Sequence, residues 1–194
     1  MGEENKKILL HICCSACASY VIKLLQADGY EVIGYFYNPS THGRNEYNRR
    51  LLDVQKFCKE NKIRLIVPSY DVQEFFAPLM PFQDRDSIKY ISDKQRWKKK
   101  RCQFCYDLIL TRTAQEAKKK NISYFSSTIL TTPYKDHEEV MNIGIELEQE
   151  IGVKFLYRDF RKGYWQGRNY ARSHKMHIAT YCGCSFSSEE GLLE

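Results

Sequence analysis

Three groups of cysteines carry the strongest chemical signal in this sequence. They are Cys13-Cys14-x-x-Cys17, Cys102-x-x-Cys105 and Cys182-x-Cys184. An isolated CxxC pair is compatible with a redox pair, half of a zinc site or no site at all. Three separated groups in one short chain are more specific, because seven thiols without a metal would be prone to oxidation. The spacing therefore predicts a metal site built from thiolates.

The number of thiols limits which metal they hold. A structural zinc site needs four ligands, so seven thiols overfill one such site. An iron–sulfur cluster needs three or four thiolates, which leaves others to hold a second metal or to act as redox thiols. We expect Cys102 and Cys105, like the first cysteine group, to open a helix whose positive dipole end faces an anionic cluster. Cys58 is the exception, because it follows Phe57 on the apolar side of a predicted helix and is expected to be a buried hydrophobic residue.

Composition limits where the protein works and how it is organised. The chain has 194 residues, of which 28% are charged and 43% hydrophobic, and this mixture predicts a single globular domain over 1–194. The N-terminal apolar run is too short for a signal peptide, and no later run is long enough to cross a membrane. We therefore expect a cytoplasmic protein without a membrane partner. In that reducing compartment cysteines are more often ligands or redox groups than disulfides.

Predicted strands and helices alternate along the chain. Strands are expected at 6–12, 31–39, 62–68, 122–128 and 153–160, and helices at 15–29, 44–61, 102–120 and 135–151. This order indicates an α/β fold, a parallel sheet with helices on both faces. Ligands bind such sheets at the carboxyl ends of the strands, where the first cysteine group lies. Residues 69–101 break the pattern and are expected to be a helical insertion, or lid, over this active edge.

Two basic stretches lead into cysteine groups. Residues 94–101 hold six basic residues in eight, and residues 158–177 run up to the third cysteine group. Such stretches are often only solvated surface. Aromatic residues are interleaved with these charges, which suits a polyanion with exposed bases, and we expect that partner to be RNA. The residues expected to contact it here, by phosphate contacts or by stacking, are Trp97, Lys98, Lys99, Lys100, Arg101 and Trp165.

Other polar residues near the predicted strand ends are candidates for proton transfer or substrate binding. His11 lies beside the first cysteine group, and Asp107 lies two residues after Cys105, so these two are the candidates for a general acid or an oxygen-donor ligand. The simpler alternatives are a histidine satisfied by backbone groups and an acid in the first turn of a helix. Four further residues are candidates for binding an RNA base or its sugar: Tyr134, His137, Asp159 and Arg161. The simpler alternative is that they are solvated loop residues.

Five segments together resemble a known family. They are LLHICCSAC, YNPSTHGRNEYNRR, RCQFCYDL, STILTTPYKDHEEV and DFRKGYWQGRNYARSHKMHIATYCGCSFS, and over residues 7–188 the chain is similar to QueH-type epoxyqueuosine reductases. The resemblance implies a fold like that of the adenine-nucleotide α-hydrolases (HUP-like), a [4Fe–4S] cluster and no cobalamin. It also implies the last step of queuosine biosynthesis, in which the epoxide of epoxyqueuosine at the tRNA wobble nucleotide becomes an alkene with electrons from an external donor. Ala16 stands where the family is expected to have proline, which affects loop stiffness.

The resemblance also implies which residues act. The ligands it implies are Cys13, Cys14, Cys102, Cys105, Cys182 and Cys184, with Cys17 as a seventh candidate. Spacing leaves open how these thiols divide among the cluster, a second thiolate-held metal ion such as iron, and free thiols.

Two alternative functions remain open at the level of sequence. One is an ATP-dependent tRNA-modifying enzyme of the same fold group, such as a thiolase, although the loop CCSACAS lacks the glycine-rich cradle for phosphate. The other is a non-enzymatic RNA-binding module stapled by zinc. An ATP-binding assay distinguishes the first, and metal analysis distinguishes the second.

Overall fold

The computed structural model describes residues 6–82 and 94–189. Five strands form one sheet in the order β3-β2-β1-β4-β5. They are β1 (Lys7–His11), β2 (Glu31–Tyr35), β3 (Arg64–Ile66), β4 (Tyr124–Ser127) and β5 (Lys154–Phe155). Every neighbouring pair is parallel, so the predicted parallel sheet is confirmed, and each predicted strand is present in shorter form.

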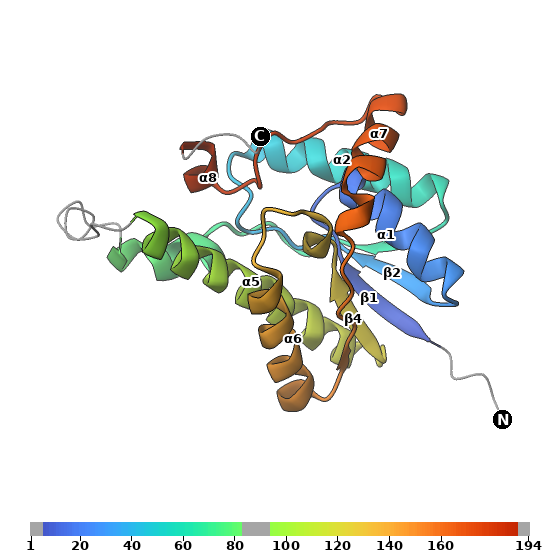
Figure 1. The fold of residues 1–194 in the computed structure, drawn as a ribbon, viewed down its shortest axis with the longest axis horizontal. Helices are drawn as coiled ribbons and strands as arrows, with labels where there is room; N and C mark the ends of the chain where they lie inside the picture. The colour runs from blue at the N-terminus through green and yellow to red at the C-terminus, as the bar shows by residue number, and fades with distance from the viewer. Residues whose placement is uncertain (1–5, 83–93, 190–194) are drawn as a thin grey trace.

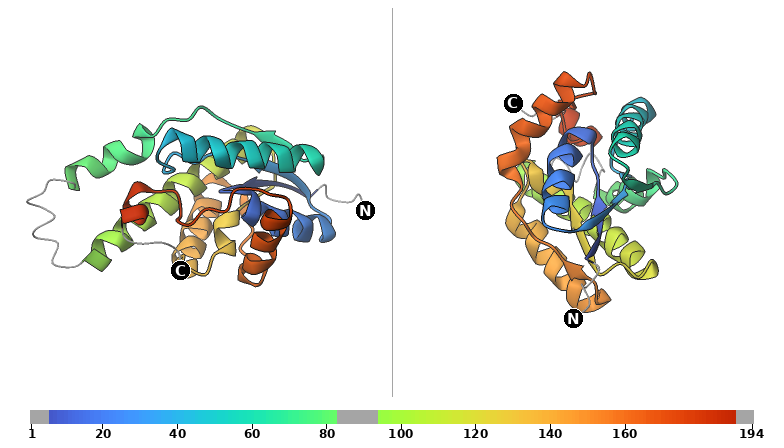
Figure 2. Two further views of the ribbon diagram at one scale, coloured as in Figure 1. Left: turned by 90° about the horizontal axis from the view of Figure 1, so that it is seen from above. Right: turned by 90° about the vertical axis from the view of Figure 1, so that its right-hand side faces the viewer.

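Helices cover both faces of the sheet. Figure 1 shows α1 (Ser15–Ala27), α2 (Arg44–Glu60) and α7 (Tyr164–Ser173) above the strands, with α5 (Lys94–Lys119) and α6 (His137–Ile151) below them. Figure 2 shows the same layers from two further sides. The shorter helices are α3 (Gln73–Phe76), α8 (Ser185–Glu189) and 3-10 turns at Ala77–Phe82, Thr128–Thr131 and Arg161–Gly163. Among the helices of the described chain, none combines the length and apolar character needed to cross a membrane.

The order of strands reverses at β1. The chain adds β2 and β3 on one side of β1 and then returns to add β4 and β5 on the other. His11 at the end of β1 lies in register with Ser127 at the end of β4. The loops after these two strands therefore open side by side at the reversal point, where ligands bind in such sheets. The first cysteine group follows β1 there, as its sequence position predicts.

The core explains why the first strand and helix form where they do. Residues 8–11 of β1 are buried without alternation, which is typical of a strand covered on both faces. In α1 the buried residues Ala18, Val21, Ile22 and Leu25 follow helical spacing, so one stripe of the helix packs on the sheet. Both elements are firmly buried, and they fix the ends of the loop that carries the first cysteines.

Helix α5 begins earlier than the sequence predicts. It starts at Lys94, so the basic run of residues 94–101 forms its first turns and Cys102 and Cys105 lie inside it. The expectation that these cysteines open the helix is wrong, because helix-favouring Lys, Arg and Gln residues extend it toward the N-terminus. Their amides are therefore not among the unpaired groups of the first turn. Of the predicted insertion at 69–101, residues 83–93 lie outside the described residues.

Helix α7 was not predicted, and it forms one wall of the site. Gly163 and Gly167 bring it close to α1: a Cβ atom on Gly167 would lie 2.1 Å from the carbonyl oxygen of Ala16. Only a glycine permits this approach at the start of α1. The four-residue spacing of these glycines is the sequence signal for a tightly packed helix.

Candidate metal and substrate site

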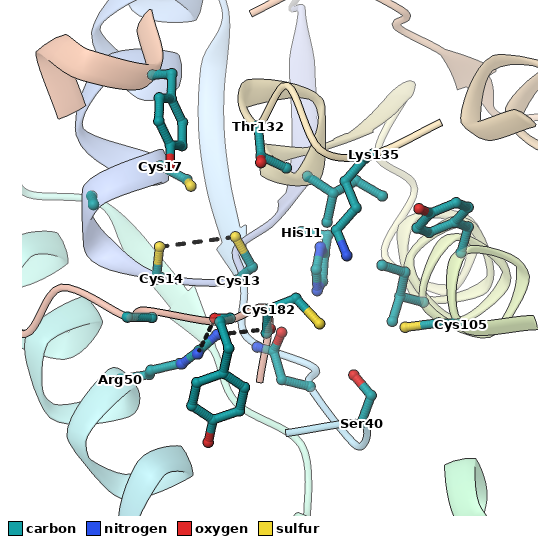
Figure 3. A pocket seen from close by; sticks show the side chains of 18 of the residues that line it. His11, Cys13, Cys14, Cys17, Ser40, Arg50, Cys105, Thr132, Lys135 and Cys182 are labelled. Carbon is teal, nitrogen blue, oxygen red and sulfur yellow. Dashed lines mark hydrogen bonds between the residues drawn. The ribbon is translucent and has the colours of Figure 1, made fainter. Parts of the chain in front are cut away.

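A cavity lies at the carboxyl ends of β1 and β4, and all three cysteine groups contribute to its wall (Figure 3). Five of the seven candidate thiols line it, those of Cys13, Cys14, Cys17, Cys105 and Cys182. All eight cysteines of the chain are free thiols. The tertiary structure thus brings together residues that the sequence separates by most of the chain length.

The first cysteine group forms a compact set of sulfur atoms. The Sγ atoms of Cys13, Cys14 and Cys17 lie within 4.8 Å of one another. The Thr128 hydroxyl, at the end of β4, accepts a hydrogen bond from the Cys13 amide at 3.0 Å and lies 3.2 Å from the Cys13 Sγ atom. Helix α1 begins directly afterwards at Ser15, which confirms that this group opens a helix. The helix N-terminus and the Thr128 hydroxyl both favour negative charge on these sulfurs.

One thiol of this group is predisposed to ionise. Hydrogen bonds from the Cys13 and Cys17 thiols hold the pKa of Cys14 well below its ordinary value, and the Arg50 charge adds to this effect. The hydrogen bond to Cys14 raises the pKa of Cys13 to about 12, and the same neighbours raise the pKa of Cys17. Of the three thiols, Cys14 is the one whose surroundings favour the ionised form.

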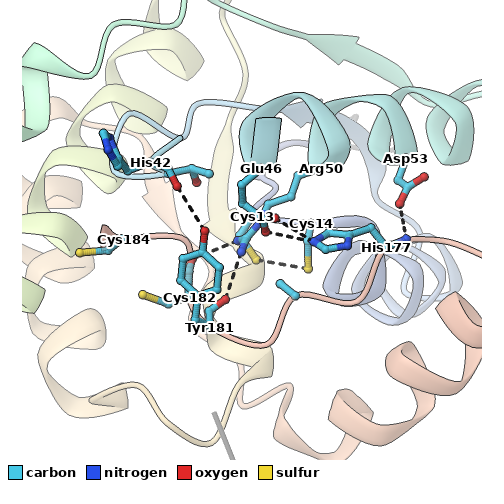
Figure 4. Close-up of polar contacts among 12 residues, drawn as sticks. Cys13, Cys14, His42, Glu46, Arg50, Asp53, His177, Tyr181, Cys182 and Cys184 are labelled. Atoms are coloured by element: carbon cyan, nitrogen blue, oxygen red, sulfur yellow. Dashed lines mark hydrogen bonds and ion pairs between the residues drawn. The ribbon is translucent and has the colours of Figure 1, made fainter. Parts of the chain in front are cut away.

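A second set of thiols consists of Cys105, Cys182 and Cys184, of which Cys105 and Cys182 line the cavity. A hydrogen bond from Cys184 holds the pKa of Cys182 well below its ordinary value, while burial raises the pKa of Cys105 to about 11. Cys184 itself is buried in a small second core with Phe75 and Leu79. Figure 4 shows Cys182 and Cys184 side by side on the C-terminal segment. In this set Cys182 is the thiol whose surroundings favour the ionised form.

Cys102 lies apart from the cavity. It lines a separate groove with Lys98, Lys99 and Tyr134. Negative charge on Cys102 still raises the pKa of Cys105, because the two residues lie on adjacent turns of α5. Cys58 packs in the main core and is 2% exposed, which confirms the prediction of a buried hydrophobic residue.

Arg50 is a buried cation that the sequence analysis missed. Its side chain is 3% exposed. The Nε atom donates to Glu46 at 2.7 Å, while Nη1 and Nη2 donate to the carbonyl oxygens of Cys182 and Tyr181 at 3.0 Å each (Figure 4). Its signal was its position on the apolar face of α2, three residues after Tyr47 and four before Val54. A charged residue on that face must have buried partners.

Gly183 explains why the third cysteine group has the form CGC. Its φ angle is +111°, in the left-handed region that favours glycine. A Cβ atom there would lie 2.8 Å from the Thr41 hydroxyl and 3.1 Å from Arg50 Nη1. Glycine therefore lets the backbone between Cys182 and Cys184 approach Arg50.

Lys135 is a second cation that sequence analysis missed. Its side chain points into the cavity from the segment before α6 (Figure 3), and its Nζ lies 5.7 Å from the centre of the Tyr106 ring. Burial disfavours its charge, but Cys182, Tyr106 and Cys105 together raise its pKa. Its sequence signal was only its position between two residues that were selected, Tyr134 and His137.

The two predicted proton donors have different surroundings. His11 lines the cavity, but its Nε2 lies 3.0 Å from the Tyr37 carbonyl oxygen and its Nδ1 lies 2.7 Å from the Ser127 hydroxyl. Burial lowers the pKa of His11 to about 4, so the ring is neutral at pH 7. Asp107 is not among the residues that line the described cavity; its charged neighbours are Glu146 and Glu150 of α6. These contacts favour the simpler, structural role for His11.

The predicted RNA-binding residues lie in several environments. Lys98, Lys99 and Lys100 are exposed on α5, while Arg101 is buried. Trp97 packs edge-on against Phe186, and Trp165 is 61% exposed.

The remaining substrate-binding candidates also differ in exposure. Tyr134 is 45% exposed, and His137 is buried, with Nε2 3.2 Å from the Thr132 carbonyl oxygen. Asp159 and Arg161 form an exposed ion pair with each other at 2.6 Å.

The donor set fits an iron–sulfur cluster. Soft thiolates are the ligands that such clusters require, and those of this cavity come from three chain segments that can approach one centre from different sides. Arg50 and Lys135 place positive charge beside them, which offsets the negative charge of several thiolates.

Comparison with known proteins shows which family this chain matches. The model of the family described as Epoxyqueuosine reductase QueH matches residues 8–190, which include all seven candidate thiols. A protein named Epoxyqueuosine reductase QueH from Dehalococcoides mccartyi is 33% identical over 185 residues, covering 95% of this chain and 93% of that protein. The Thermotoga maritima protein of the same name is 31% identical over 182 residues, covering 93% and 89%.

Solved structures show the same fold at low sequence identity. U34-tRNA thiolase NcsA from Methanococcus maripaludis, with its [4Fe-4S] cluster, has a TM-score of 0.56 and 14% identity, covering 96% of this chain and 64% of that one. A predicted subunit of tRNA methyltransferase from Methanocaldococcus jannaschii has a TM-score of 0.50 and 16% identity, covering 85% and 74%. These likenesses, with the strand order, confirm the fold of the adenine-nucleotide α-hydrolase type. The family match over almost the whole chain shows that this protein belongs to the epoxyqueuosine reductase QueH family, a family of oxidoreductases.

Proposed function

We propose that this chain reduces the epoxide of epoxyqueuosine in tRNA to the alkene of queuosine, the last step of queuosine biosynthesis. The observation that carries the proposal is the convergence of thiols from three distant cysteine groups on one cavity, in a chain of this family. The reaction consumes two electrons and two protons. Both carbon–oxygen bonds of the epoxide break, a carbon–carbon double bond forms, and the oxygen leaves as water.

The proposed cofactor is a [4Fe–4S] cluster held by thiolates of the cavity. Cys13, Cys14, Cys17, Cys105 and Cys182 line the cavity, whereas Cys102 lines a separate groove and Cys184 is buried in the small second core. Seven thiols exceed the ligands of one cluster, so the proposal includes a second thiolate-held iron ion. When bound, such a centre supplies electrons, received from an external donor, and Lewis acidity toward oxygen.

The protein's own groups hold the site in its charged form. The Arg50 charge helps to lower the pKa of Cys14, and the Lys135 charge helps to lower the pKa of Cys182. Both cations therefore favour thiolates. Thr128 orients Cys13 through its two contacts. The assignment of proton delivery to His11 or Asp107 stays a prediction from the sequence: His11 lines the cavity but both of its ring nitrogens have protein partners, and Asp107 does not line the described cavity.

The proposed substrate is the wobble nucleotide in the anticodon loop of tRNA. Lys98 and Lys99 line the groove that also contains Cys102 and Tyr134, so phosphates held there would lie close to the thiol site. Asp136 and Glu139 form part of the same groove and would repel phosphate, which limits phosphate contacts to its lysine wall. Binding through these lysines depends on salt, because counterions are released from the RNA.

The match to the epoxyqueuosine reductase family does not favour either of the two alternative functions. A chain of the epoxyqueuosine reductase family needs neither ATP nor a purely structural zinc site for the proposed reaction. The likeness to a tRNA thiolase, at 14% identity, concerns the fold alone.

The test combines metal analysis with a reaction. Protein purified without oxygen is assayed for iron and acid-labile sulfide, then incubated with dithionite and tRNA that contains epoxyqueuosine. Nucleosides are analysed by mass spectrometry. We expect loss of one oxygen from the modified base, independent of cobalamin and ATP. Cluster-loaded protein that leaves the epoxide intact would refute the reductase, and a zinc-only protein would refute its redox chemistry.

A further inference from the structure

A ridge of three aromatic side chains leads from the cavity to the surface. The Tyr164 ring lies edge to face with Tyr134 at 5.9 Å and with Trp165 at 5.2 Å between ring centres. Tyr164 is buried and lines the cavity, whereas Tyr134 and Trp165 are 45% and 61% exposed. We call Tyr134, Tyr164 and Trp165 the aromatic ridge. Its inner ring is part of the site, and its outer rings face solvent.

One cation, Arg168, lies against the aromatic ridge. The Arg168 guanidinium lies 5.5 Å from the centre of the Tyr164 ring and 6.0 Å from that of Trp165, and Arg168 also lines the cavity. Its Nη1 donates to the Ala179 carbonyl oxygen at 3.4 Å. Its Nε is buried and has no hydrogen-bond partner within residues 6–82 and 94–189. Lys135, next to Tyr134 in the chain, points into the same cavity (Figure 3).

This combination indicates what the aromatic ridge binds. A single exposed aromatic residue is ordinary on a protein surface. Rings in contact with one another, with a guanidinium beside them and a cavity at one end, are suited to an unpaired nucleobase and its phosphate. An apolar protein segment would gain nothing from the Arg168 charge.

The structure also distinguishes the two tryptophans. Trp97 is half-buried, with its ring 5.9 Å from Phe186 and 5.9 Å from the Arg101 guanidinium carbon. It packs against the small second core, which includes Phe75 and Leu79. Trp165 is the tryptophan that adjoins a residue of the cavity wall.

We infer that the aromatic ridge is the stacking platform for an unpaired tRNA base that flanks the modified nucleotide, while the modified base itself reaches the cavity. The choice of tRNA rests on the proposed function. Arg168 would contact the phosphate between the two nucleotides, since it touches both the outer ring and the cavity.

Intrinsic fluorescence tests this inference directly, because Trp97 and Trp165 are the two tryptophans of the chain. The W97F variant reports Trp165 alone, and W165F reports Trp97 alone. Both cluster-loaded proteins are titrated with an anticodon stem-loop RNA that carries guanine at the wobble position. We expect RNA to quench the W97F protein and to leave the W165F protein unchanged. A stem-loop with abasic sites flanking the wobble position should bind without this quenching.

Affinity provides a second readout. Trp165→Ala should weaken stem-loop binding on the order of tenfold, because one stacked base is no longer supported. Leu52→Ala is the matched control, since Leu52 is 65% exposed on α2 and should leave affinity unchanged. Quenching of Trp97 instead of Trp165, or W165A binding as tightly as the unmodified protein, would overturn the inference.

The binding titration uses neither dithionite nor an epoxide. If Trp165 is quenched but epoxyqueuosine is not reduced, the proposed function fails and the aromatic ridge stands. If the epoxide is reduced and W165A binds normally, the aromatic ridge fails and the proposed function stands.

Discussion

Arg50 holds the backbone of Cys182, with Nη1 donating to the Cys182 carbonyl oxygen at 3.0 Å. Glu46 fixes the other end of the guanidinium and also lies 3.0 Å from His177 Nε2, on the segment that leads to Cys182. The Asp53 carboxylate accepts a hydrogen bond from the backbone amide of His177. Helix α2 therefore fastens the C-terminal segment at several points, and the Arg50 contact lies nearest the thiols.

Replacing Arg50 should loosen the third cysteine group. Arg50→Met leaves the Cys182 and Tyr181 carbonyl oxygens without this donor and leaves His177 as the partner of Glu46. Removing one partner of a buried ion pair costs about 3–5 kcal/mol. We expect lower iron and sulfide content, a shifted reduction potential and a lower unfolding midpoint. Arg49→Met, next to it but exposed, is the control. Full cluster content in R50M would show that Arg50 does not position Cys182.

The glycine between Cys182 and Cys184 should not tolerate a side chain. Gly183→Ala forces a Cβ toward Thr41 and a left-handed backbone that costs about 1–2 kcal/mol for alanine. We expect reduced cluster content, measured by iron and sulfide analysis. At Gly43 an added Cβ meets nothing within 4 Å, so Gly43→Ala should keep its cluster. Equal cluster content in both variants would contradict this account.

The position of each cysteine predicts its effect on metal content. Cys105→Ala and Cys182→Ala remove thiols from the cavity wall, so each should lower iron and sulfide per chain. Cys58→Ala should retain both, because Cys58 packs in the core. Its cost should appear in thermal unfolding instead. Metal loss in C58A together with a normal content in C105A would reverse the proposed assignment of ligands.

Ionisation of Cys58 should lower the free energy of unfolding at alkaline pH. Burial raises its pKa from 9.0 to about 11, so the unfolded chain loses this proton at lower pH than the folded one. The thiol contributes stability that is complete below pH 9 and is lost as pH rises toward 11. Urea unfolding at pH 8 and pH 10.5 should show a smaller loss for Cys58→Ala than for the unmodified protein. An equal loss would mean that Cys58 ionises as freely in the folded state.

The lysines at the start of α5 should govern the salt dependence of tRNA binding. Replacing Lys98, Lys99 and Lys100 with alanine should weaken binding and lower the slope of log affinity against log salt by about one unit for each phosphate that the variant no longer binds. Cluster absorbance should not change. The same replacement at residues 118–120 removes equal charge at the other end of α5. An unchanged slope in the first variant would exclude this surface as the RNA-binding face.

Several features of the fold and of the site could be predicted from the sequence alone. Predicted strands that alternate with helices indicated the parallel sheet. The first strand has a continuous apolar run, because a strand that is covered on both faces must be hydrophobic on both sides. The position of the first cysteine group after β1 placed it at the ligand edge, since parallel strands end together. The types and number of cysteines identified thiolate metal chemistry, which needs no knowledge of packing. Cys58 was recognised in the same way, from its neighbours on one helix face.

Other features were decided by tertiary structure, because they depend on contacts between residues far apart in the chain. Local periodicity could not show that Cys105 turns to the cavity while Cys102 faces a groove, or that Asp107 faces α6. Arg50 and Lys135 gained their roles only when the C-terminal segment packed across the sheet edge. Two tryptophans that look alike in sequence were separated in the same way. Trp97 packs beside the second core and Trp165 stands at the surface, because burial is set by which elements meet and not by residue type.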